Sequence, residues 1–129
     1  MRVKTPKIGI ILDQQGQTYD QIKAAAIEAD RLGFHSIWLN DHFFFTGAPY
    51  LECFTTLSAL SRIASKVRLG TLVSCNSYRN PAHLAKMVST IDNASNGRVE
   101  FGIGAGWHDE EYFAYGYPFP PASSTINSG

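Results

Sequence analysis

The sequence repeats one pattern four times, and this repetition limits the folds that are open to a chain of 129 residues. In each repeat a short apolar run is followed by a polar loop and, in the first three, by a segment with apolar residues at helical spacing. The runs begin near Ile8, Ser36, Val67 and Arg98, roughly 30 residues apart, which is the length of a β-α-β unit. Alternating strands and helices predict a parallel sheet with right-handed crossovers.

Local signals support this division. Residues 8–12 form a nearly continuous apolar run, which is typical of a strand buried on both faces. Thr18 opens a capping box, and Gly33 is suited to end the helix that follows. Asn80 and Pro81 are favourable cap and first-turn residues for the third helix. We therefore expect an α/β fold.

Eight such units make a (β/α)8 barrel of the TIM type. This chain has the pattern for only four strands and three full helices, so we expect an α/β half-barrel over residues 1–121. Prolines and small polar residues follow Tyr117, and we expect residues 122–129 to be a disordered tail. A four-stranded half-barrel has open edges and a bare inner face. We therefore expect the chain alone to self-associate or to pair with a second barrel half.

The amino-acid composition argues against nucleic acids and membranes as binding partners. The chain has 11 basic and 11 acidic residues, and no basic run indicates nucleic-acid or membrane binding. No apolar segment reaches the length of a membrane span, and the N-terminus does not resemble a signal peptide. Cys53 and Cys75 fit neither a metal motif nor a disulfide framework. We expect two reduced thiols in a cytoplasmic protein.

Polar and aromatic side chains follow the predicted strands at their carboxyl ends. The second strand leads into Asp41 and His42, and the fourth leads through Gly106 into Trp107 and His108. Because the carboxyl ends of parallel strands form the catalytic face of a barrel, we expect these residues to cluster there. Histidine titrates near neutral pH, so both imidazoles are candidates for proton transfer.

The same residues have structural explanations that the sequence leaves open. Asp41 and His42 can cap the following segment, and the phenylalanines at 43–45 either line a pocket or pack under the long loop. The glycines at 102, 104 and 106 lack the third glycine of the dinucleotide fingerprint, and strand packing explains some of them. The acids at 109–111 are favoured at a helix N-terminus, and we interpret them in that way.

A metal site is a further alternative. It would use Asp41, His42, His108 and Asp109, whose side chains are suitable ligands for hard or borderline cations. Neither pair has the spacing of a histidine metal motif, so we predict no metal ligand in this chain.

Three longer motifs occur together in this chain. They are Ser36-Ile-Trp-Leu-Asn-Asp-His-Phe43, Gly70-Thr-Leu-Val-Ser74 with Tyr78-Arg-Asn-Pro81, and Asn96-Gly-Arg-Val-Glu-Phe-Gly-Ile-Gly-Ala-Gly-Trp-His108 with Glu110-Glu-Tyr112. In this order and spacing they resemble the bacterial luciferase-like monooxygenases, and most of all the branch that uses the deazaflavin coenzyme F420. The resemblance covers residues 7–121 and the first half of the family's barrel.

The resemblance implies a flavin- or deazaflavin-dependent oxidoreductase or monooxygenase that acts on a small organic molecule with FMN or coenzyme F420. It implies a strand-end bulge between Thr71 and Ser74, often with a non-prolyl cis peptide, that supports the cofactor ring. His42 and His108 are the candidate catalytic residues. The positions that match cofactor-binding residues are Asp41, His42, Leu72, Val73, Ser74, Ala105, Gly106 and Trp107.

The family's main phosphate-binding elements belong to the later half of its barrel, so we expect a truncated copy that is not a competent enzyme alone. Sugar-phosphate dehydrogenases of this family carry an acid where Trp107 stands, so that substrate is not expected. Two other functions remain open. One is a non-catalytic half-barrel that associates with another chain, and the other is a metal-dependent barrel hydrolase.

Overall fold

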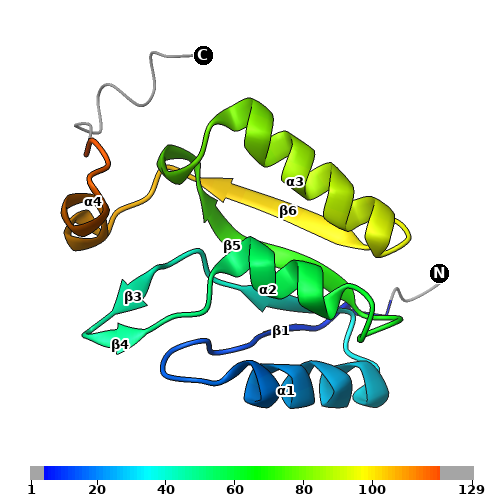
Figure 1. The fold of residues 1–129 in the computed structure, drawn as a ribbon. Coiled ribbons are helices and arrows are strands. Elements are labelled where there is room, and N and C mark those ends of the chain that lie inside the picture. The colour runs from blue at the N-terminus through cyan, green and yellow to red at the C-terminus, as the bar shows by residue number, and fades with distance from the viewer. Residues whose placement is uncertain (1–4, 120–129) are drawn as a thin grey trace.

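A four-stranded parallel sheet forms the centre of the fold (Figure 1). The computed structural model describes residues 5–119, so the tail predicted at 122–129 lies outside the described residues. The strands lie side by side in sequence order: β1 (Gly9–Ile11), β2 (Ser36–Leu39), β5 (Arg68–Cys75) and β6 (Val99–Gly104). Each neighbouring pair is parallel, which confirms the predicted α/β architecture.

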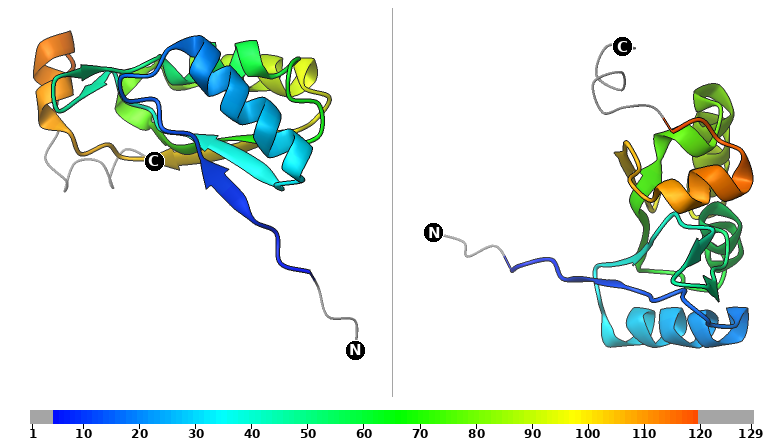
Figure 2. Two further views of the ribbon diagram at one scale, coloured as in Figure 1. Left: turned by 90° about the horizontal axis from the view of Figure 1, so that it is seen from below. Right: turned by 90° about the vertical axis from the view of Figure 1, so that its left-hand side faces the viewer.

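Three helices cover one face of this sheet (Figure 2): α1 (Tyr19–Leu32), α2 (Cys53–Leu60) and α3 (Pro81–Ala94). Their ends follow the sequence signals. Thr18 and Gln21 form the expected capping box, and Gly33 ends α1 with φ 78°. The side chain of Asn80 accepts hydrogen bonds from the backbone at the start of α3. No helix among the described residues is long and apolar enough to cross a membrane.

The core lies between these helices and the sheet. Ile37 and Leu69 point from the sheet into it and are fully buried, as are Leu57 and Leu60 of α2. On the other face Ile11 remains 53% exposed. The prediction that residues 8–12 are buried on both faces is therefore wrong for this chain, because the described helices cover only one face.

The outer side of β6 is covered only near the start of the strand. Val99 packs against the core, and alternation along the strand places Phe101 and Ile103 on the same side. Both nevertheless stay exposed, at 42% and 53%. Within residues 5–119, no helix runs back along β6 to cover them.

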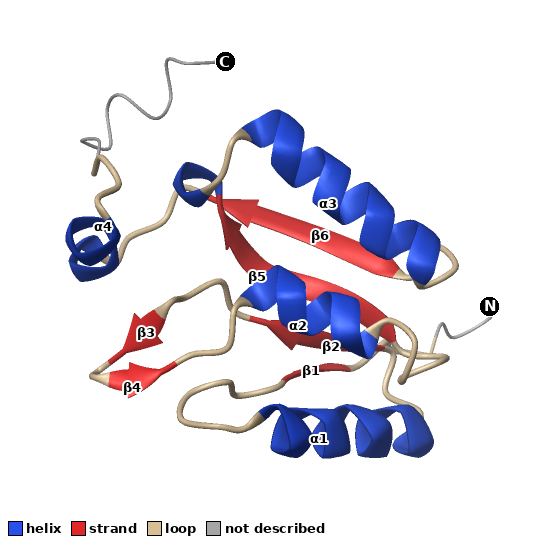
Figure 3. Ribbon diagram, viewed as in Figure 1, coloured by secondary structure: helices blue, strands red, loops and turns tan. Residues whose placement is uncertain are grey.

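Smaller elements gather at the carboxyl end of the sheet (Figure 3). They are a hairpin of β3 (Phe44–Phe45) and β4 (Ala48–Pro49), a 3-10 turn η1 (Asn76–Tyr78) and a short helix α4 (Asp109–Tyr115). The hairpin occupies a segment that the sequence predicted to be a loop, and α4 begins at the acids that were interpreted as marking a helix N-terminus. The acids that open α4 occupy its first turn, as the macrodipole favours.

Candidate functional site

A cavity of about 430 Å³ opens where β2, β5 and β6 end. Its lining residues are Asn40, Asp41, His42, Leu72, Val73, Cys75, Tyr78, Gly104, Ala105, Gly106 and Trp107. The structure thus brings together every residue expected to contact a cofactor except Ser74. Ser74 is fully buried beside the cavity, and its hydroxyl lies 3.4 Å from the carboxylate of Asp41. The binding role of these residues stays a prediction.

Strand β5 changes course at this cavity. A cis peptide bond joins Leu72 to Val73, and the register with β6 shifts between Thr71 and Ser74. This is the bulge that the family resemblance implied for these positions. Leu72 and Val73 remain 43% and 44% exposed, so the bend gives the cavity an apolar floor.

The glycines of β6 and its following loop are required by the packing of the protein itself. A Cβ atom at Gly104 would lie 2.6 Å from a methyl group of Val73. Gly106 has φ 84°, and a Cβ atom there would lie 2.1 Å from the hydroxyl of Tyr112 and 2.5 Å from the thiol of Cys75. The packing explanation therefore holds for both glycines.

Asp41 is held in a buried ion pair with Arg79. The two guanidinium nitrogens lie 2.6 and 2.8 Å from the carboxylate oxygens, and the backbone N–H of Cys75 donates to the same carboxylate at 2.9 Å. Arg79 also donates to Glu52 at 2.6 Å. Burial alone lowers the pKa of Arg79, but these ion pairs outweigh it and raise that pKa above its ordinary value. Asp41 thereby fastens the end of β2 to the end of β5.

Glu111, on α4, is a second buried carboxylate at this end of the sheet. Its Oε2 lies 2.8 Å from Nδ1 of His42 and 2.7 Å from the hydroxyl of Tyr78. Its Oε1 accepts from the backbone N–H groups of Phe43 and Phe44. Burial raises the pKa of Glu111, but the hydrogen bonds outweigh this and hold its pKa below the usual value.

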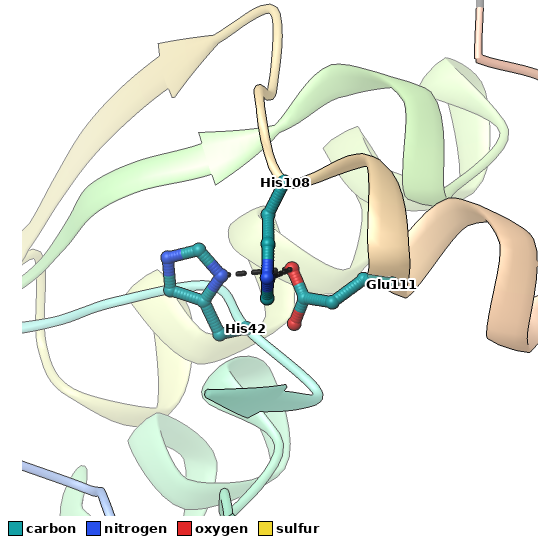
Figure 4. A group of neighbouring side chains, drawn as sticks. All are labelled: His42, His108 and Glu111. Carbon is teal, nitrogen blue, oxygen red and sulfur yellow. Dashed lines mark hydrogen bonds and ion pairs between the residues drawn. The ribbon is translucent and has the colours of Figure 1, made fainter. Parts of the chain in front are cut away.

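His108 lies beside the same carboxylate without a hydrogen bond to it (Figure 4). Its Nδ1 is 3.4 Å from Oε2 of Glu111, is buried, and has no hydrogen-bond partner among residues 5–119. Of the two candidate catalytic histidines, His42 lines the cavity, whereas His108 does not.

The metal arrangement considered from the sequence does not form. Asp109 is exposed, and the carboxylate of Asp41 forms an ion pair with Arg79. A different group, His42, His108 and Glu111, has possible ligand atoms within 4.8 Å of one another (Figure 4).

Aromatic side chains surround His42. The ring of Trp107, which is 63% exposed, lies 5.9 Å from the imidazole and 6.0 Å from the ring of Phe45. Phe43 instead stacks on Tyr78, with ring centres 4.6 Å apart. The packing interpretation therefore applies to Phe43, while Phe45 lies beside Trp107, which lines the cavity.

The known proteins that resemble this chain settle its family. The luciferase-like monooxygenase family matches residues 5–123, nearly the whole sequence. The chain belongs to this family. The resemblance seen in the three sequence motifs is thereby confirmed.

Some relatives of the chain are named as flavin-dependent and others as F420-dependent. The chain is 36% identical over 100 residues to the oxygenase component of the flavin-dependent trigonelline monooxygenase of Acinetobacter baylyi, covering 76% of this chain and 27% of that protein. It is 31% identical over 99 residues to the F420-dependent glucose-6-phosphate dehydrogenase of Amycolatopsis mediterranei, covering 74% and 30%. The chain spans about a quarter to a third of the length of such curated relatives.

A solved luciferase-like structure gives the same picture of the fold. An F420-dependent secondary alcohol dehydrogenase, in complex with an F420–acetone adduct, superimposes with a TM-score of 0.82 at 26% identity. The match covers 92% of this chain and 37% of the dehydrogenase. The chain is therefore a partial TIM barrel of the luciferase-like type.

Two site residues, Arg79 and Glu111, were not assigned roles from the sequence. Both lie inside the motifs that carry the family resemblance, which was the only signal that marked them. Their partners are remote in the sequence: Arg79 binds Asp41, 38 residues earlier, and Glu111 binds His42, 69 residues earlier. No local spacing rule connects such pairs.

We predict that Arg79→Met lowers the free energy of unfolding by about 3–5 kcal/mol, because it leaves the buried carboxylate of Asp41 without its counter-charge. The measurement is urea denaturation followed by circular dichroism. Arg31→Met is the matched control. It removes an ion pair with Glu28 whose side chains are 66% and 52% exposed, and it should cost no more than about 1 kcal/mol. Equal losses in the two variants would contradict the prediction.

Proposed function

We propose that this luciferase-like chain supplies the cofactor-facing side of a flavin- or deazaflavin-dependent oxidoreductase that acts on a small organic molecule. The observation that carries the proposal is the cavity at the strand ends, where an apolar floor lies beside an imidazole. The family membership supports the same class of chemistry. Relatives named for a flavin and for F420 both match, so FMN and F420 are both candidates.

The lining of the cavity suits a planar, conjugated ring. Leu72 and Val73 present apolar surface that the protein leaves exposed, and Trp107 adds an exposed aromatic face. Such surfaces pack well on the face of a flat ring system. His42 offers a polar edge beside them, where a ring substituent or a substrate oxygen can form a hydrogen bond.

The residues of the chain then have separate tasks. Leu72 and Val73 support the ring, while Ala105, Gly106 and Trp107 contact it from the β6 side. His42 donates or accepts a proton at the edge of the cavity. Asp41 holds the loop before His42 in place through its ion pair with Arg79. The hydroxyl of Ser74 donates to the carboxylate of Asp41. When bound, the cofactor supplies hydride transfer or oxygen activation.

We also propose that further barrel strands and helices cover the bare surfaces of this sheet, whether they belong to the same polypeptide or to another chain. Ile11 on the inner face and Ile103 on the outer side of β6 are both 53% exposed. Strands β1 and β6 have unpaired edges within the described residues, and such edges favour association. A half-barrel that associates but binds no cofactor is the competing proposal.

Titration of the protein with FMN and with F420, followed by cofactor fluorescence, distinguishes the two proposals. We expect saturable binding of one of them, with a dissociation constant on the order of 1 mM or about −4 kcal/mol, because only part of a barrel is present. Val73→Asp should abolish it, since a carboxylate would replace the apolar floor. Ile27→Asp is the matched control, because Ile27 lies on α1 and is equally exposed, at 45%. Absence of binding, or binding that Val73→Asp leaves unchanged, would refute the cofactor site.

The solution mass at several protein concentrations tests the association. We expect the mass to rise with concentration and Ile103→Lys to weaken the association at least about tenfold, because a buried isoleucine contributes roughly 1.5–3 kcal/mol. Ile27→Lys, on the exposed surface of α1, should leave it unchanged. A monomer at every concentration would argue against exposed sheet surfaces as association sites.

A further inference from the structure

The carboxylate of Glu111 is fully buried, contacts Nδ1 of His42 and is not among the residues that line the cavity. We propose that Glu111 is a positioning residue that holds His42 as the tautomer with its proton on Nδ1, so that Nε2 presents a lone pair to the cavity. The use of that lone pair in catalysis rests on the proposed function. The tautomer itself does not.

The direction of each hydrogen bond supports this assignment. The backbone N–H groups of Phe43 and Phe44 can only donate, so Oε1 of Glu111 must accept from both. The lowered pKa of Glu111 keeps the carboxylate ionised near neutral pH, and an ionised carboxylate is an acceptor only. At 2.8 Å from Oε2, Nδ1 of His42 must therefore carry the proton.

The hydrogen bond of the His42 ring within residues 5–119 is made at Nδ1, and Nε2 is the other ring nitrogen. Figure 4 shows Nε2 of His42 on the far side of the imidazole from Glu111. His42 lines the cavity and its side chain is 19% exposed. Fixing one nitrogen by a carboxylate sets both the orientation of the ring and the tautomer, which is how histidine bases are commonly prepared.

The same carboxylate separates the roles of the two neighbouring histidines. Its Oε2 already accepts from His42 and from Tyr78, so its usual acceptor positions are filled. His108 lies 3.4 Å away with a buried Nδ1 that has no hydrogen-bond partner within residues 5–119. Glu111 therefore sets the tautomer and ring orientation of His42 but not those of His108. Of the two histidines, His42 is the one positioned to act as a base.

A cation held by His42, His108 and Glu111 is the arrangement that competes with this proposal. The three side chains are close enough to share one. A cation at Nδ1 of His42 would need the lone pair that our assignment gives to the proton. The two arrangements therefore make opposite predictions about one nitrogen atom.

Nuclear magnetic resonance of protein with 15N-labelled histidine rings tests the assignment directly. In chelator-treated protein with a neutral imidazole, we expect His42 to show a protonated Nδ1 and an unprotonated Nε2. Glu111→Gln should exchange these two signals. Its amide oxygen can still accept from the two backbone N–H groups, so its NH2 group must face Nδ1 and donate to it.

Glu110→Gln is the matched control, because it removes the same charge from the adjacent residue, whose side chain is 75% exposed and lies 3.7 Å from His108. It should leave the His42 signals unchanged. Tyr78→Phe removes the other donor at Oε2 while keeping the carboxylate, and it should also preserve the protonated Nδ1.

Three results would overturn the proposal. They are a protonated Nε2 with a bare Nδ1 in the native protein, an unchanged tautomer in Glu111→Gln, and stoichiometric Zn²⁺ binding that shifts Nδ1 of both histidines. The signals of the native protein decide the question even if a variant fails to fold. None of these signals depends on a cofactor, so failed FMN and F420 titrations would remove the proposed function and leave the tautomer standing.

Discussion

The arrangement of the cavity depends on one buried carboxylate, that of Glu111. It accepts hydrogen bonds from the loop after β2, through His42 and two backbone N–H groups, and from Tyr78 in η1. Three segments that are distant in the sequence are thereby joined beside the site. An ionised group is stable in this buried position because all of its acceptor positions are used.

The carboxylate of Asp41 has a similar structural role at the ends of β2 and β5. Asp41 is bound by Arg79 and by the backbone of Cys75, so the ends of β2 and β5 are held at a fixed separation. Breaking such a pair leaves a buried charge without a partner, which costs far more than losing an exposed pair. The two buried carboxylates nearest the cavity, those of Asp41 and Glu111, are therefore occupied in shaping it.

The sequence predicted the framework because its signals are local. Apolar runs, the cap at Thr18 and the stop at Gly33 each depend on a few neighbouring residues, and the structure confirms the elements they imply. The clustering of the candidate site residues was predicted as well, since the carboxyl ends of parallel strands must meet on one side. One-sided burial of residues 8–12 was missed because an apolar run does not reveal how many layers cover it.

The roles of Glu111 and Arg79 were missed for a different reason. Glu111 stands in a run of acids at the start of α4, and the macrodipole already explains acids there. Three of its donors lie 67–69 residues earlier in the chain and Tyr78 lies 33 residues earlier, so only the folded structure reveals them. An acid at position 111 is favoured both by the helix N-terminus and by the contacts with His42 and the following loop. Only the first of these two reasons can be read from the sequence.

Amide hydrogen exchange at Phe43 and Phe44 is the most direct test of the central claim that the buried carboxylate of Glu111 pins the loop beside the cavity. These amides donate to Oε1, so the account predicts exchange that is strongly slowed relative to the exposed amide of Gly47, three or four residues along the same chain segment. Exchange of Phe43 and Phe44 as fast as that of Gly47 would contradict it.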